Sequence, residues 1–182
     1  MTFAAASGRD RYALLSWLAT EFGAKGRLGK KAIQKLVHIL DEGLLVSTGY
    51  RFSLYTYGAF SRDLAGDIDI SSSLGAIEVE YVEVDNRYIV SAGTEAEALI
   101  HSSRFLALNS DSLSRLKVEF SEESARGLEL FSTLLFLERR KPGAPDAELV
   151  DELLQLKPKY NRYEADSGLG RVRKFISSAK AT

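Results

Sequence analysis

The sequence contains no cysteine, and only two of its 182 residues are histidines, His38 and His101. The absence of cysteine excludes disulfide bonds, thiolate zinc sites and a cysteine nucleophile. Neither histidine has a histidine or acidic partner at the spacing of a metal site or catalytic triad. The motifs Gly-x-Ser-x-Gly and His-Glu-x-x-His are also absent. We therefore expect a protein that is not an enzyme and uses no metal or other cofactor. The one enzymatic alternative left open is catalysis by acidic side chains alone. We interpret His38 as a core or boundary residue, because it neighbours an apolar stripe.

Long apolar runs are missing as well. The most apolar run, Leu128–Leu137, is too short to span a bilayer and is interrupted by polar residues. The first residues lack the basic region and apolar core of a secretory signal. A chain without cysteine also fits a reducing compartment, so we predict a cytoplasmic protein with no membrane contact. The sequence allows an oligomer but does not specify one.

The charges nearly cancel, with a net charge of −1, but they are segregated along the chain. Residues 22–40 contain five basic residues and no acid, whereas residues 61–100 contain nine acids against only Arg62 and Arg87. Residues 157–180 are basic again. The net charge gives no overall attraction to nucleic acid. Any such attraction would therefore have to come from one of the two basic regions.

Hydrophobic periodicity and turn residues predict the elements of the first half. The predicted elements are a helix capped by Asp10 and ended by Gly23, a helix over 30–42, a strand over 50–57, a helix over 62–74 with Ser61 as N-cap, and strands over 77–84 and 87–90. Asp85-Asn86 joins the last two strands as a two-residue turn. The alternation slips at Tyr81 and Val82, which indicates a β-bulge.

The second half is predicted to be helical. Its helices cover 95–108 and 122–139, then one from Asp146 to about Leu156, and a last one to about Ser178 that Gly168 and Gly170 interrupt. The order of elements before it is that of a winged helix-turn-helix, with 62–74 as the recognition helix. We therefore predict an α+β, mostly helical fold: a winged helix-turn-helix unit over 10–92 and a C-terminal helical extension over 93–180, packed on it. Its Leu128–Leu137 stripe should be buried against Tyr12, Trp17 or the second helix.

Two apparent ligand motifs favour ordinary structure instead. Gly23–Lys31 resembles a phosphate-binding loop, but its glycine spacing is wrong and Lys31 stands where the hydroxyl residue belongs. A flexible turn between helices explains it better. Asp63, Asp67 and Asp69 lack the spacing of a calcium loop, so we interpret them as a capped, solvated helix face that binds no metal.

Basic residues near aromatic ones are the strongest candidates for a binding surface. Such groups neutralise phosphates or stack on bases, although a solvated face is an equally good interpretation of each stretch alone. In the second helix, the lysines are predicted to project away from the apolar stripe. The candidate nucleic-acid-binding residues are Arg27, Lys30, Lys31, Lys35, Arg62, Lys159, Arg162, Arg171, Arg173 and Lys174.

Three blocks of sequence carry a resemblance to a known family. They are Lys31-Ala32-Ile33-Gln34-Lys35, Tyr57-Gly58-Ala59-Phe60-Ser61 and Leu156-Lys157-Pro158-Lys159-Tyr160. In this order the chain resembles the YwgA-type winged-helix family over about residues 10–176, and more remotely the Panacea or SocA-like antitoxin domain. Two departures are Ala59, where the family has proline, and the glycines of the last helix. The resemblance implies a winged-helix fold and a regulatory or interaction role, and it supplies no catalytic residues.

Two functions follow from these features. The first is a DNA-binding regulator that contacts phosphates through the basic second helix and tail, because the acidic third helix would oppose docking in the major groove. The alternative is a protein-interaction module, antitoxin-like or adaptor-like, that uses its acidic central face without nucleic acid. The partner is thus expected to be DNA or a protein.

Overall fold

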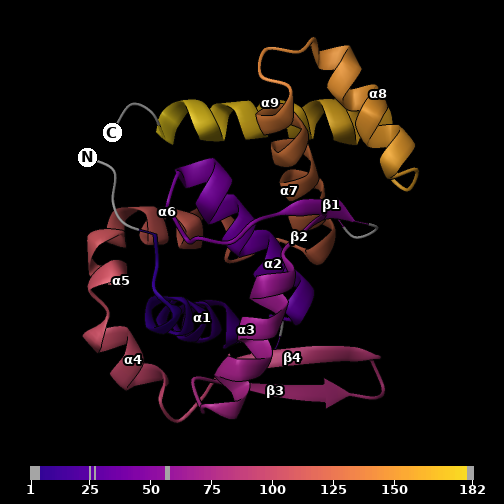
Figure 1. Ribbon diagram of the computed structural model, residues 1–182. Helices are drawn as coiled ribbons and strands as arrows, with labels where there is room; N and C mark the ends of the chain where they lie inside the picture. Colours follow the sequence, from indigo (N-terminus) through magenta and orange to yellow (C-terminus); the bar gives the residue numbers. More distant parts are fainter. Residues whose placement is uncertain (1–4, 25, 27, 56–57, 180–182) are drawn as a thin grey trace.

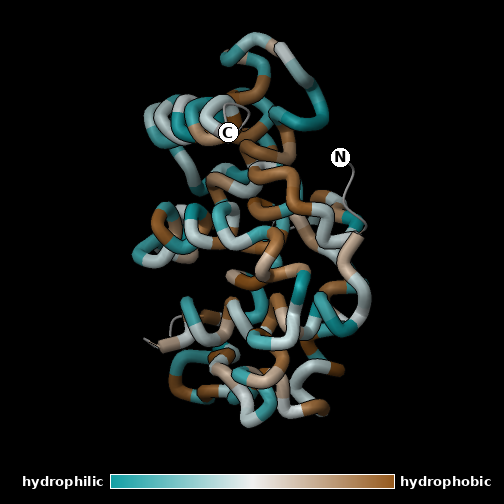
Figure 2. The backbone as a smooth tube through the Cα atoms, turned by 90° about the vertical axis from the view of Figure 1, so that its left-hand side faces the viewer, coloured by the Kyte–Doolittle hydropathy of each residue, from teal (hydrophilic) through white to brown (hydrophobic). Residues whose placement is uncertain are grey.

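A computed structural model of the chain describes residues 5–24, 26, 28–55 and 58–179 (Figure 1). The predicted class, α+β and mostly helical, is confirmed, because helices form most of the described chain and the strands form two small antiparallel sheets. Hydrophobic positions run through the centre of the molecule (Figure 2), and residues from both halves of the chain share one core. Within the described residues, no helix is both long enough and apolar enough to cross a membrane.

The first two helices are α1 (Gly8–Gly23) and α2 (Lys30–His38). The N-cap of α1 is Ser7, so the prediction of Asp10 as the cap was wrong. Asp10 is instead the acidic half of a capping box, since each side chain accepts a hydrogen bond from the backbone N–H of the other residue. The second helix continues past His38 as a π-helical turn, η1 (Ile39–Gly43), which ends one residue beyond the predicted boundary.

A short β-hairpin separates α2 from the third helix. It pairs β1 (Ser53–Tyr55) with β2 (Gly58–Phe60). The strand predicted from residue 50 begins at Ser53, its predicted end at 56–57 lies outside the described residues, and β2 was missed. Helix α3 (Arg62–Ser73) follows directly. Its N-cap is Ser61, whose hydroxyl accepts a hydrogen bond from the Leu64 N–H, so this predicted cap is confirmed.

The second hairpin pairs β3 (Ile77–Val82) with β4 (Arg87–Ala92). The pairing runs without interruption from Ile77↔Ala92 to Val82↔Arg87, so the predicted bulge is wrong. The pattern slips because the opposed Tyr81 and Tyr88 lie beyond the buried part of their own face and are exposed. Four residues, 83–86, connect the strands instead of two. The backbone N–H of Val90 also donates to the Leu28 carbonyl at 2.8 Å, which ties the segment before α2 to β4.

The helix predicted over 95–108 is two helices, α4 (Ala96–Ser102) and α5 (Arg104–Leu108). They separate because the Ser103 hydroxyl caps α5 by accepting from the Leu106 N–H. Helix α6 (Ser110–Phe120) was not predicted. Its buried residues Leu113, Leu116 and Phe120 have the three-and-four spacing of a helix, so the sequence carried this signal and it was overlooked.

Helix α7 (Ala125–Arg140) is central, and α8 (Asp146–Leu156) and α9 (Arg162–Ala179) pack on it (Figure 1). The buried stripe of α7 contacts α2, as predicted. Helix α9 continues through both glycines, so the predicted interruption is wrong. A Cβ on Gly168 would lie 2.8 Å from Leu134 Cδ1, so this glycine allows α9 to lie close against α7.

Candidate functional site

The second helix and the segment before α3 are locked together by hydrogen bonds. The Gln34 amide donates to the Ser61 carbonyl at 2.9 Å and accepts from the Ser61 N–H at 2.8 Å. The Lys35 ammonium donates to the Ala59 carbonyl at 2.7 Å. Because these partners are backbone groups, α2 fixes the path of the chain from β2 into α3.

A third segment, between α8 and α9, reaches the same place. Lys157 Nζ lies 2.8 Å from Glu129 Oε1, and Lys159 Nζ lies 2.7 Å from Glu129 Oε2. The Tyr160 hydroxyl donates to the Arg126 carbonyl on α7. Burial alone would raise the pKa of Glu129, but the hydrogen bonds from the two lysines lower it overall. Glu129 is therefore a carboxylate shared by two ammonium groups.

Lys35 is the most perturbed cation of this site. Its exposed fraction is 5%, so the prediction that it projects away from the core was wrong. Its pKa is lowered to about 8 overall: burial is the main cause, Glu129 acts in the opposite direction, and Lys157 and Lys31 add smaller lowering effects. We call Lys31, Lys35, Lys157 and Lys159, gathered around Glu129, the lysine cluster.

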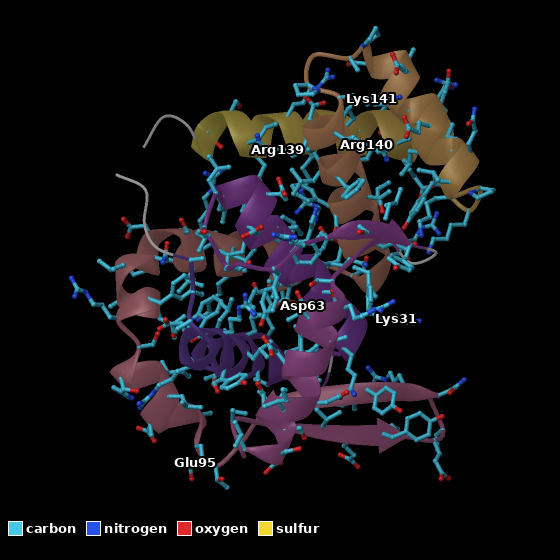
Figure 3. The ribbon with its side chains drawn as sticks, viewed as in Figure 1. Lys31, Asp63, Glu95, Arg139, Arg140 and Lys141 are labelled. Carbon is cyan, nitrogen blue, oxygen red and sulfur yellow. The ribbon has the colours of Figure 1, made fainter. Side chains whose placement is uncertain are left out.

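Two cavities flank the lysine cluster. One, of about 360 Å³, lies between α2, α3 and the β1–β2 hairpin, and we call it the α2–α3 pocket. The other, of about 370 Å³, lies between α2 and α7. Lys31 and Lys35 line both cavities. Figure 3 shows Lys31 pointing outward from α2, above the β3–β4 hairpin. The residues that line the α2–α3 pocket include Lys30, Lys31, Lys35, Tyr55, Phe60, Ala65, Ile68 and Asp69.

Most of the other predicted nucleic-acid-binding residues have partners within the protein. Arg162 pairs with Asp151, Arg171 with Glu123, and Arg173 with Glu138 and Asp146. These contacts join α9 to α7, to α8 and to the loop before α7, so the predicted basic tail is largely neutralised.

Fewer predicted cations remain at the surface. Lys30 pairs with Asp69 at 2.7 Å and lies over the Tyr88 ring. Arg62 and Lys174 are exposed, with no ion pair to another described residue. Arg27 lies outside the described residues.

An acidic surface covers α3 and the second hairpin. We define the acidic face as the exposed residues Asp63, Asp69, Glu78, Glu80, Glu83 and Asp85. Only Arg62 and Arg87 are exposed cations on the same elements. Five exposed large hydrophobic residues share these elements: Ile70, Leu74, Tyr81, Val84 and Tyr88. Acid and apolar surface thus occur together here.

The aspartates of α3 have separate surroundings. Asp67 accepts a hydrogen bond from the Tyr50 hydroxyl at 2.8 Å and lies 3.5 Å from Arg11, whereas Asp69 pairs with Lys30. Among the described residues, no three acidic or histidine side chains gather in a way that would hold a metal ion. The arrangement agrees with the interpretation of Asp63 and Asp69 as solvated, while Asp67 has a structural role that the sequence did not indicate.

His38 is a core residue, as predicted. Its Nδ1 lies 2.9 Å from the Ser132 hydroxyl, and its ring packs against Phe52. Burial lowers the pKa of His38 to about 3, and nearby Lys35 acts in the same direction, so the ring is neutral at physiological pH.

No protein-family model matches the chain, and no curated protein matches it significantly. The resemblance to the YwgA-type family therefore stays a prediction. The described residues of the three blocks that carry it meet around Lys35, while Tyr57 lies outside the described residues.

Proposed function

We propose that the protein is a non-enzymatic interaction module whose acidic face binds a basic surface of a partner protein. The proposal includes a winged-helix unit over residues 10–92. In its support, α1, α2, α3, β3 and β4 follow the order of that fold. The Leu28–Val90 hydrogen bond also supplies the short strand contact that winged helices form between their first two helices and the wing.

The charge on α3 and the β3–β4 hairpin carries this proposal. A DNA-binding winged helix places its third helix in the major groove, where phosphates surround it. Here the exposed acids outnumber the exposed cations on these elements, so phosphates would be repelled. A basic protein surface would be attracted instead, and the exposed Tyr81, Val84 and Tyr88 would supply apolar contact area.

Affinity capture with matched charge variants tests the proposal. Glu80→Lys combined with Glu83→Lys should release a protein partner that the wild type retains, and salt should weaken the wild-type complex. Asp166→Lys, on the exposed side of α9, is the control because it changes charge outside the acidic face. Equal recovery of the partner by the double variant would contradict the proposal.

The second candidate is a DNA-binding regulator, which the order of elements favours. It would contact phosphates through Lys31, Arg62 and Lys174, which are exposed, and through Lys30, which pairs with Asp69. Mobility shifts with random duplex DNA at several salt concentrations separate the candidates. The regulator requires an affinity that falls with salt and that Lys31→Glu weakens for all sequences alike, whereas the interaction module requires no such affinity. Lys35 is unsuitable for this test because it is buried.

A further inference from the structure

We infer that the α2–α3 pocket binds an organic anion, with the apolar body of the ligand against Tyr55, Phe60 and Ile68 and its carboxylate or phosphate at the lysines. This inference does not depend on a protein partner, and the pocket shares only Asp69 with the acidic face. It rests on the shape, the apolar walls and the charge of a single cavity.

The walls of the pocket suit an apolar, planar body. The Tyr55 and Phe60 rings are packed edge to face with their centroids 5.4 Å apart, and both line the cavity. Ile68 and Ala65 line it from α3. The volume of about 360 Å³ lies in the range of small-molecule sites, which are mostly apolar with a few placed polar groups.

The charged groups of the pocket select an anion. Lys30, Lys31 and Lys35 line it, and among the described lining residues Asp69, which pairs with Lys30, is the one carboxylate. An uncharged ligand would leave this excess of positive charge beside an apolar cavity, where low polarity strengthens electrostatic interactions. A carboxylate or a phosphate would balance the excess.

The space beside the Lys35 ammonium is kept open by Gly58. A Cβ on Gly58 would lie 3.5 Å from Lys35 Nζ and 2.8 Å from Thr133 Oγ1, and the φ of this residue, +87°, favours glycine. Among the described residues, the ammonium donates one hydrogen bond, to the Ala59 carbonyl. An ammonium has three donors, so others are available to a ligand.

Binding should depend on pH through Lys35. The charged groups that act on its ammonium are Glu129 on α7, Lys157 after α8 and Lys31 on α2. Its pKa of about 8 means that it loses its proton within the accessible pH range. A bound anion stabilises the ammonium, so affinity should fall between about pH 7 and about pH 9, and binding at about pH 8 should take up protons.

Calorimetric titration with 2-naphthoate, 1-naphthyl phosphate and 2-naphthamide tests the inference. We expect saturable, one-to-one binding of at least one anion, and about tenfold or more weaker binding of the uncharged amide. The tighter of the two anions identifies the acidic group that the pocket prefers. Equal affinity for the amide, or no saturable binding of either anion at millimolar concentration, would overturn the inference.

Two variants locate the site. Ala65→Leu fills the pocket and leaves every lysine in place, whereas Lys35→Met removes the buried charge. Each should weaken anion binding about tenfold or more, and the surface control Lys174→Met should not change it. Ala65→Leu decides the question if Lys35→Met fails to fold, and unchanged affinity in it would overturn the inference. The acidic-face double variant should still bind the anion, so loss of a protein partner and loss of the ligand are separate outcomes.

Discussion

Positive charge has different surroundings at two places in the molecule. In the lysine cluster, Lys35 and Lys157 are buried, and Lys157 and Lys159 share Glu129. Along α9, each of Arg162, Arg171 and Arg173 has at least one carboxylate of its own. The exposed side-chain fraction is 6% for Lys157 and 57% for Arg162.

This difference decides which charges matter for stability. A buried ion pair that loses one partner leaves an uncompensated charge in a medium of low polarity, which is costly. Breaking an exposed ion pair lowers the free energy of unfolding only slightly, because water and salt screen each charge. Lysines and arginines that look alike in the sequence therefore differ greatly in their expected effect when they are changed.

The largest expected effect is that of Glu129→Gln. This change leaves the buried Lys157 without its carboxylate and removes the one acid that favours the charged form of Lys35. We expect the free energy of unfolding to fall by about 3 kcal/mol or more, measured by urea denaturation at neutral pH.

A double variant provides the control for this result. Glu129→Leu with Lys157→Met removes both charges and should be clearly more stable than Glu129→Gln. A loss below about 1 kcal/mol for Glu129→Gln would mean that the cluster behaves like an exposed pair. The contrast between the two regions would then fail.

The pH dependence of stability should reveal the lowered pKa of Lys35 in the folded protein. Its pKa is about 8 in the folded protein against 10.5 in the unfolded chain, so between these values the unfolded chain binds more protons. Lys35 therefore makes stability rise with pH, and this contribution is lost as pH falls through about 8. From about pH 7 to about pH 10 we expect a gain of about 2 kcal/mol in the wild type relative to Lys35→Met. Parallel urea midpoints for the two proteins over this range would contradict it.

The fold was predictable where one local signal acts alone. The apolar stripe of α2, the Ser61 cap and the positions of β3 and β4 were recovered from spacing and residue type. Errors arose where tertiary contacts override local preference. Gly168 was expected to interrupt α9, but it is the position at which α9 approaches Leu134 on α7.

The site was less predictable because burial does not follow from charge. Lys35 and Lys31 lie four residues apart and were expected on one solvated face, but Lys35 is covered by the segment around Ala59. The pairing of Arg162, Arg171 and Arg173 depends on which acids of α6–α8 face α9, and no spacing in the sequence reveals this. One signal was available: two of the quoted blocks carry lysines and the third carries Gly58, and the described residues of these segments meet around Lys35.

A smaller effect is expected from an uncharged hydrogen bond next to the cluster. Ser61→Ala removes the N-cap of α3 but keeps the backbone bonds to Gln34. We expect a loss of about 1 kcal/mol in thermal or urea unfolding, the usual cost of losing a serine cap. Ser61→Asn keeps a side-chain oxygen that can accept the capping bond but is larger than serine, so Ser61→Gly is the better comparison and should cost less. A loss equal to that of Glu129→Gln would show that the cap, and not the charge, dominates this region.

The smallest effect should come from the exposed pair on α8 and α9. Asp151→Asn removes the carboxylate that faces Arg162, and both side chains are more than half exposed. Water replaces the lost partner, so the free energy of unfolding should change by no more than about 0.5 kcal/mol. Raising the salt concentration should shrink even this difference, because the charges are accessible to counterions.

The measurement is urea unfolding of Asp151→Asn beside Glu129→Gln. Each variant removes one carboxylate charge by acid-to-amide replacement, and they differ in the number and the burial of the cations left behind: Lys157 and Lys159 for Glu129, and the exposed Arg162 for Asp151. A loss for Asp151→Asn as large as that for Glu129→Gln would mean that burial is not what separates the lysine cluster from the arginines of α9.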